Sequence, residues 1–221
     1  MKTSLSMIFA VAICVTSAAF AIPVKVVDFS PGPGTAGNWT YNGAGNLTFD
    51  QNVLVDKGLG SNCDTLVGAL VRIPAFEIGG IPGAPYTLTP IGNNELQIRS
   101  ADSSKIYMKG NLTSGDFVTI GTVAGGYTEF KTDITNVTIT ADGQALGSAA
   151  LATIAHMTHP SLDFALSLQG GSGAGYYSFA QMLDGGHTGS GGFSGDMSVP
   201  EPATMSLLTL GGLALLRRRR A

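Results

Sequence analysis

The most constraining feature of this sequence is a regular alternation of large apolar side chains with small or polar ones between residues 162 and 169. The large side chains are Leu162, Phe164, Leu166 and Leu168. Consecutive side chains of a β-strand point to opposite faces, so a period of two places all four on one face. The segment therefore predicts a strand with one buried face and one solvated face.

The same period recurs through the chain between residues 22 and 198. Glycine separates these segments: the 177 residues contain 29 glycines, about 16 % against a usual ~7 %. Candidate strands recur about every 8–12 residues, which is typical of antiparallel all-β folds. We predict an antiparallel β-sandwich, jelly-roll-like in topology, with a β-barrel as the alternative. Residues 144–157 are rich in alanine and leucine, so we expect a short helix or a crossover loop there.

Composition excludes several classes of protein. Only 12 % of the residues are charged and 44 % are hydrophobic, so the chain is neither a highly charged disordered protein nor a nucleic-acid binder. Without its two ends, the body from Ile22 to Ser198 keeps seven basic and 14 acidic side chains, a net charge of −7. No linker divides it. We therefore expect one acidic domain over 22–198, with no nucleic-acid partner.

The first 21 residues have the order of a secretory signal peptide. Lys2 precedes an apolar run over residues 7–15, and small residues follow that end in Ala19, Phe20 and Ala21. This order predicts export by Sec-type machinery and cleavage after Ala21 by a signal peptidase. A membrane anchor is the alternative, but the run is well below the ~20 residues that span a bilayer. We expect a short helix over this cleavable segment.

The last 23 residues, 199–221, combine three features in a fixed order. Pro200, Glu201 and Pro202 come first, the apolar segment 205–216 follows, and a basic cluster comes last, formed by Arg217, Arg218, Arg219 and Arg220. The prolines favour an extended conformation that a protease can bind. A helix of the 12 apolar residues would be ~18 Å long against a hydrocarbon thickness of ~30 Å. Because the arginines should stay on the cytoplasmic side, we expect a short, temporary helical tether that holds the body outside the inner membrane.

In these features the tail resembles the PEP-CTERM sorting tails of bacterial exported proteins. The resemblance rests on the Pro-Glu-Pro motif, the apolar segment and the terminal arginines, about a tenth of the chain. It implies recognition by a membrane-embedded exosortase, cleavage near Pro-Glu-Pro, and release or transfer of the body to the cell surface or extracellular matrix. Because such tails often accompany producers of exopolysaccharide, it also implies an exopolysaccharide partner. A plain single-pass anchor is the alternative.

No catalytic constellation emerges from the body. Cys63 is the one thiol left after signal cleavage, and the neighbouring Asp64 does not lower a thiol pKa. His156, His159 and His187 could ligate zinc, yet no metal-binding repeat accompanies them. Calcium fits an exported acidic β-domain better, but no EF-hand or repeated Asp/Gly pattern appears. We therefore expect no catalytic residue, no metal site and no cofactor, with calcium as the alternative that no motif supports.

Two carbohydrate hypotheses remain open. Four aromatic residues could stack on sugar rings or belong to the core. They are Trp39, Tyr41, Tyr176 and Tyr177. Glu77 and Glu95 could form the acid pair of a glycosidase, but only at a separation that the fold must supply. The leading hypothesis is a non-enzymatic exported protein with a structural or adhesive role at the cell surface or in the matrix. The alternatives are a carbohydrate-binding module and a secreted polysaccharide hydrolase or lyase.

Overall fold

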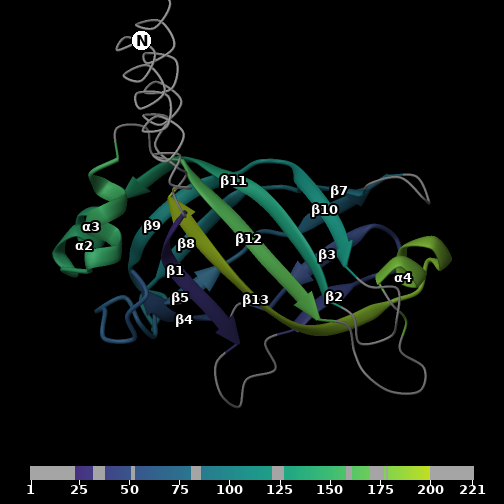
Figure 1. Ribbon diagram of the computed structural model, residues 1–221, viewed down its shortest axis with the longest axis horizontal. Coiled ribbons are helices and arrows are strands. Elements are labelled where there is room, and N and C mark those ends of the chain that lie inside the picture. The colour runs from purple at the N-terminus through teal and green to yellow at the C-terminus, as the bar shows by residue number, and fades with distance from the viewer. Residues whose placement is uncertain are drawn as a thin grey trace, which may run out of the picture. The chain divides into compact units, whose positions relative to one another are not determined.

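The computed structural model describes residues 23–31, 38–50, 53–80, 86–120, 127–157, 161–169, 177 and 179–199. Within these ranges, Val24–Val199 form one compact unit. Figure 1 shows this unit as long curved strands with short helices at two opposite ends. The expected helices of the signal peptide and of the tail lie outside the described residues.

The described residues contain 13 strands in one sheet, and each strand is antiparallel to its neighbours. The strands are β1 (Val24–Pro31), β2 (Asn38–Tyr41), β3 (Asn46–Phe49), β4 (Val53–Gly58), β5 (Leu70–Arg72), β6 (Phe76–Gly79), β7 (Tyr86–Pro90), β8 (Glu95–Arg99), β9 (Ile106–Leu112), β10 (Gly115–Ile120), β11 (Tyr127–Ile139), β12 (Leu162–Gln169) and β13 (Gly189–Val199). The helices are α2 (Ala141–Ala145), α3 (Ala149–Ala155) and α4 (Phe179–Gly185).

The strands follow one another around the sheet in chain order. A single place in the barrel wall can be filled by two short strands that pair with successive parts of the same neighbour, and we call each such place a position. β1 and β2 share one position in this sense, because β1 pairs with β13 along Gly195–Val199 and β2 pairs with it along Gly189–Gly192. The pairs β3/β4, β5/β6, β7/β8 and β9/β10 share positions in the same way, and β11, β12 and β13 each occupy one alone. β13 also pairs with β12, so the circle of eight positions closes. The fold is an up-and-down antiparallel β-barrel in which five positions are divided into two strands.

The all-β prediction is confirmed, and the architecture is the barrel that we gave as the alternative. The preferred jelly-roll-like sandwich does not form. A sandwich keeps two separate sheets, whereas here β13 joins β12 on one edge to β1 and β2 on the other. Period-two alternation is common to both architectures, because each buries one face of every strand.

The interruptions in the divided positions lie next to one another across the barrel wall. Ile91 N donates to Ala75 O at 2.9 Å, and Leu112 N donates to Asn94 O at 3.0 Å. Both bonds connect residues at the breaks of neighbouring positions. Pro74 lies in the break between β5 and β6, where its missing N–H prevents a continuous ladder. The strands are consequently shorter than the barrel positions they fill.

Large apolar side chains fill the inside of the barrel. Six phenylalanines form a continuous series of ring contacts, with centroid separations between 5.1 and 6.4 Å. In order of contact they are Phe29, Phe164, Phe130, Phe76, Phe49 and Phe193. The alternation predicted for residues 162–169 is present, because Leu162, Phe164, Leu166 and Leu168 are all buried. Such a series is the packed core expected of a barrel of this size.

The helices lie in the last two connections of the barrel. α2 and α3 connect β11 to β12 at the end where β1 begins and β13 ends, which we call the exit end. α4 connects β12 to β13 at the opposite end, which we call the far end (Figure 1). The hydroxyls of Thr140 and Ser148 cap α2 and α3 by accepting bonds from Gly143 N and Leu151 N. The helix expected over 144–157 is thus divided into two, because Gly147 adopts a positive φ of 71° between them.

Candidate functional site

The two ends of the described barrel chain meet at the exit end. Val24 of β1 pairs with Val199 of β13. In the sequence, Pro23 precedes Val24 and Pro200 follows Val199. A proline has no backbone N–H, so neither residue can extend the ladder by donating a hydrogen bond. The barrel wall therefore continues up to the residue before the Pro-Glu-Pro sequence.

The connection between β4 and β5 lies at the same end and is held by one carboxylate. Asp64 accepts hydrogen bonds from Leu66 N at 2.8 Å and from Ala150 N of α3 at 3.1 Å. Burial raises the pKa of Asp64, but hydrogen bonds from Ser148 and from these backbone groups outweigh burial and hold the pKa below its usual value. Asp64 thus ties the connection to α3, which is a structural role.

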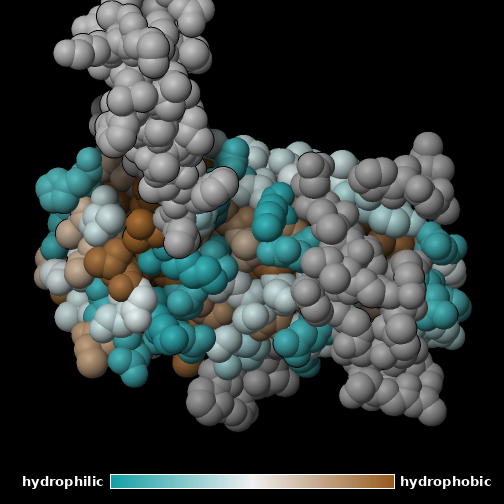
Figure 2. Space-filling view, viewed as in Figure 1, coloured by the Kyte–Doolittle hydropathy of each residue, from teal (hydrophilic) through white to brown (hydrophobic). Residues whose placement is uncertain are grey.

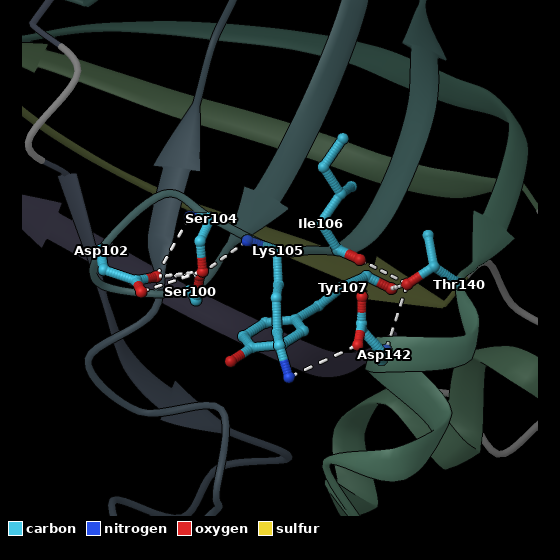
Figure 3. Close-up of polar contacts among 9 residues, drawn as sticks. Ser100, Asp102, Ser104, Lys105, Ile106, Tyr107, Thr140 and Asp142 are labelled. Carbon is cyan, nitrogen blue, oxygen red and sulfur yellow. Dashed lines mark hydrogen bonds and ion pairs between the residues drawn. The ribbon is translucent and has the colours of Figure 1, made fainter.

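A second polar cluster at the exit end joins the β8–β9 connection to α2 (Figure 3). Asp102 accepts hydrogen bonds from Ser100 Oγ at 2.5 Å and from Ser104 N at 3.0 Å, and these bonds lower the pKa of Asp102 to about 2. Lys105 forms an ion pair with Asp142 at 3.5 Å. Each contact joins the connection to itself or to α2, so this cluster also stabilises the fold.

A groove of about 410 Å³ crosses the outer face of β1, β4, β11, β12 and β13. Its floor consists of small residues, among them Ala165, Ser167, Ser194 and Gly195. Ser167 lies directly opposite Ser194 across the β12–β13 pairing. On the face seen in Figure 2, pale residues of intermediate hydropathy lie between teal hydrophilic ones. This groove is the candidate contact site of the barrel wall.

Charged side chains border the groove. Lys25 Nζ lies 2.9 Å from Asp196 and 3.7 Å from Asp28, and the hydrogen bond to Asp196 raises the pKa of Lys25. Asp56 and Lys57 of β4 and Glu129 of β11 line the same groove, so four carboxylates and two ammonium groups border it. Both signs of charge are therefore present, together with hydroxyl groups that can donate and accept hydrogen bonds. The lining is therefore polar and has more acidic than basic side chains.

A pair of acidic residues lies farther along the same outer face. Asp133 of β11 is directly opposite Asp163 of β12. Burial raises the pKa of Asp163, and the negative charge of Asp133 raises it further. Like charges directly opposite each other destabilise a sheet. Ionisation of both carboxyls should therefore lower the free energy of unfolding of the barrel as the pH rises through the raised pKa of Asp163.

At the far end, α4 is attached to the barrel by a phenol–carboxylate contact. Tyr86 of β7 donates from its hydroxyl to Asp184 Oδ1 at 2.5 Å, and this hydrogen bond raises the pKa of Tyr86 to about 12. The ring of Tyr177 stacks on His187 with a centroid separation of 3.9 Å. Met182 of α4 is buried. The polar groups here hold the helix in place.

The aromatic residues considered for sugar stacking do not form a surface strip. Trp39 is 0 % exposed and Tyr41 is 4 % exposed, because both point into the barrel. The indole Nε1 of Trp39 donates to Gln169 O at 3.0 Å. The sugar-stacking hypothesis is therefore wrong for these two residues. Tyr177 is partly exposed but stacks on His187, and Tyr176 lies outside the described residues.

The acidic pair considered for glycoside hydrolysis is placed on two different strands. Glu77 lies on β6 opposite Thr89 of β7, and Glu95 lies on β8 opposite Asn111 of β9. Glu95 forms an ion pair with Lys109 at 3.8 Å. The strand register thus does not bring these two carboxylates side by side.

The histidines and the thiol are also dispersed. His156 is the C-cap of α3 at the exit end, His187 follows α4 at the far end, and His159 lies outside the described residues. Cys63 is exposed in the β4–β5 connection. Among the described residues, no group of three or more His, Cys, Asp or Glu side chains has the geometry of a metal site. No helix in the described ranges is long and apolar enough to cross a bilayer.

Sequence reasoning missed the groove, although part of its signal is present in the sequence. Ala165 and Ser167 are the small, outward-facing residues of the alternating segment, and Gly195 lies in the glycine-rich stretch 189–195. In the structure this stretch belongs to β13, where a Cβ on Gly195 would lie 2.5 Å from Ala165 O and from the ring of Phe29. Glycine is needed there because the neighbouring strand approaches closely.

The fold and the chain ends together define a class of protein: a closed β-barrel with a packed core, whose chain enters and leaves at one end. Residues 198–220 match the family model of the PEP-CTERM protein-sorting motif. The chain thus carries a PEP-CTERM sorting motif, which marks an exported protein whose tail is processed by an exosortase-type enzyme. No curated protein and no solved structure matches the chain.

The matched segment extends from the barrel into the tail. It begins at Ser198, inside β13, and includes Pro200, Glu201 and Pro202 and the cluster Arg217–Arg220. These tail residues lie outside the described residues, as do Ala19 and Ala21 of the predicted signal-peptide cleavage site. Their roles in sorting and cleavage stay predictions from the sequence.

Proposed function

We propose that the exported barrel has a non-enzymatic structural or adhesive role at the cell surface or in the extracellular matrix. The observation that carries this proposal is the packed interior. A barrel of eight strands holds a small ligand only where its interior leaves space, and here the phenylalanine series and Trp39 occupy it. Contacts with other molecules are therefore assigned to the outer wall and the two ends.

The barrel wall is also suited to a structural role. Closure pairs the first described strand with the last, so the sheet formed by the described residues leaves neither β1 nor β13 as an edge to which other chains could add. Asp64 joins the β4–β5 connection to α3, Asp102 stabilises the β8–β9 connection internally, and Tyr86 joins β7 to α4. These features support a rigid module that is delivered intact to its destination.

The test uses the native host. A strain without this protein should lose cell-to-surface or cell-to-matrix cohesion under shear, and the wild-type chain should restore it. The matched control is the chain with Pro200→Ala and Glu201→Ala, which should be exported but remain unprocessed and fail to restore cohesion. Unchanged cohesion together with impaired polysaccharide breakdown in the deletion strain would instead favour the secreted hydrolase or lyase.

The groove favours a second candidate, a carbohydrate-binding module. Ser30, Ser167 and Ser194 line it and present hydroxyl groups to it. Hydroxyls beside carboxylates and ammonium groups can both donate to and accept from a polyhydroxylated chain. Exopolysaccharide from the host is the natural ligand to test.

Filling the groove tests this second candidate. Ser167→Tyr places a large ring on the groove floor and should abolish retention on exopolysaccharide from the host. Thr138→Tyr is the matched control, because Thr138 is exposed on β11 and does not line the groove. Equal retention of both variants, at the wild-type level, would refute the groove as a carbohydrate site without affecting the structural role.

A further inference from the structure

The space between barrel and tail is unusually short. β13 ends at Val199, and the sorting motif match begins at Ser198, so the last two strand residues already belong to the motif segment. The apolar segment begins at Met205, six residues after Val199. Six residues span at most ~20 Å when fully extended. The exit end of the barrel therefore stays within ~20 Å of any bilayer that holds the apolar segment.

The surface of the exit end is partly apolar. The large hydrophobic side chains exposed in the described ranges are Val24 (53 %), Leu59 (40 %), Val67 (37 %) and Tyr177 (40 %). Val24 begins β1, and Leu59 lies beside it, because its N–H donates to Val26 O of β1. Val67 lies farther along the same β4–β5 connection, where the N–H of the next residue, Gly68, donates to Val55 O of β4. We call Val24, Leu59 and Val67 the exit rim.

The exit rim is held in place by its backbone. Leu59 has a φ of 50°, a left-handed conformation that is uncommon for leucine. Its N–H donates to Val26 O of β1 at 2.8 Å, and Val67 N donates to Asp64 O at 3.0 Å. Asp64 in turn is bonded to α3. The apolar side chains are thus presented outward by a connection that is fixed at several points.

We propose that the exit rim rests in the headgroup region of the membrane while the tail is inserted, so that the lipid surface is the partner of this end of the barrel. The proposal rests on the proposed function in one respect: it assumes that the apolar segment 205–216 holds the exported protein temporarily at the membrane. Interfacial lipid lies a few ångströms beyond the hydrocarbon, within reach of the five-residue spacer 200–204. Three apolar side chains would bind a membrane weakly by themselves, but the tether keeps their effective concentration high.

Cys63 offers a native probe of this contact. It is exposed in the same connection as Leu59 and Val67. The chain from Ile22 to Ala221 is reconstituted into vesicles of phosphatidylethanolamine and phosphatidylglycerol and carries a nitroxide on Cys63. The matched control has Cys63→Ser and Ala44→Cys, which moves the label to the exposed β2–β3 connection at the far end. Both proteins have the same tether.

The expected result is a difference in collision rates between the two labels. The label at position 63 should collide more often with oxygen and less often with a water-soluble nickel chelate, as expected for headgroup depth. The label at position 44 should behave as in water. Adding Leu59→Ser and Val67→Ser should return the label at position 63 to water-like values, whereas adding Tyr177→Ser at the far end should not.

Two different outcomes would overturn the proposal, and vesicle flotation separates them. If the chain does not float with the vesicles, the tether itself is wrong and the proposed sorting route fails with it. If the chain floats but labels at 63 and 44 have equal, water-like collision rates, the tether stands and the lipid contact of the exit rim is refuted.

Discussion

Gly195 and Gly192 form a matched pair for testing how tightly the barrel wall is packed. Both lie on β13, and neither needs a positive φ. A Cβ added to Gly195 would lie 2.5 Å from Ala165 O and 2.5 Å from the Phe29 ring. At Gly192 the nearest heavy atom is 4.0 Å away, on the side chain of Gln169. The same substitution, glycine to alanine, should therefore have opposite effects at the two positions.

The magnitudes follow from these contacts. Gly195→Ala must displace either the β12 backbone or Phe29, whose ring stacks on Phe164 at 5.9 Å. Overpacking a core costs about 1–3 kcal/mol, and a disturbed aromatic pair adds about 0.5–1.5 kcal/mol. We expect Gly195→Ala to lower the free energy of unfolding by about 2–4 kcal/mol. Gly192→Ala should raise it by about 0.4–1 kcal/mol, because alanine restricts the unfolded chain.

Urea unfolding of residues 22–199 measures both effects. With a urea slope of about 2 kcal/mol per molar, the Gly195→Ala midpoint should fall by about 1–2 M, and the Gly192→Ala midpoint should stay level or rise slightly. An unchanged slope would confirm that the variants unfold to a similar state. Equal midpoints for the two variants would mean that β12 and β13 are not in close contact at Gly195, and the packing described for the groove floor would be wrong.

Three further changes give independent tests. Asp163→Asn should stabilise the barrel at neutral pH, because it removes the cost of ionising Asp163 beside Asp133. In the wild type this cost is present above the raised pKa of Asp163 and disappears as the pH falls toward the usual value of 3.8. The urea midpoints measured near pH 4 and pH 7 should therefore differ less in the variant than in the wild type. Tyr86→Phe should speed amide exchange in α4. In the wild type, the bond to Asp184 stabilises below the usual tyrosine pKa of 10.0 and should be lost as the pH rises through about 12, which absorbance titration of the phenols would follow. Replacing 200–201 by two alanines should leave export intact but keep the full-length chain in the membrane fraction, as mass spectrometry of its carboxyl terminus would show.

Strand content was predictable because side-chain alternation records burial directly. Leu162 and Phe164 face inward and Asp163 faces outward, as a period of two requires. Closure was not predictable, because it depends on the pairing of β1 with β13, which leaves no local pattern. The alternation was therefore equally compatible with the jelly-roll-like sandwich that we preferred and with the barrel that forms.

Of the two functional features, the sorting tail was predictable from the sequence and the groove in the barrel wall was not. The Pro-Glu-Pro motif, the apolar segment and the arginines are contiguous, so their order is readable without a fold. The groove combines residues of five strands, and Ser30 and Ser194 are 164 positions apart in the chain. Trp39 illustrates a second difficulty. A large aromatic residue in a strand has the same local sequence pattern whether its side chain faces a ligand or, as here, the core.

The pairing of the first strand with the last also sets the order of events during translocation. A chain that emerges amino terminus first presents β1 early, but the partner of Val24 is Val199, 175 residues later. Until β13 emerges, β1 and β12 are open edges that can pair with other chains, and such long-range closure is slow. The apolar segment follows β13 almost immediately. If this segment is arrested in the membrane, as its sequence predicts, each nascent chain would be held apart from its neighbours while the barrel closes.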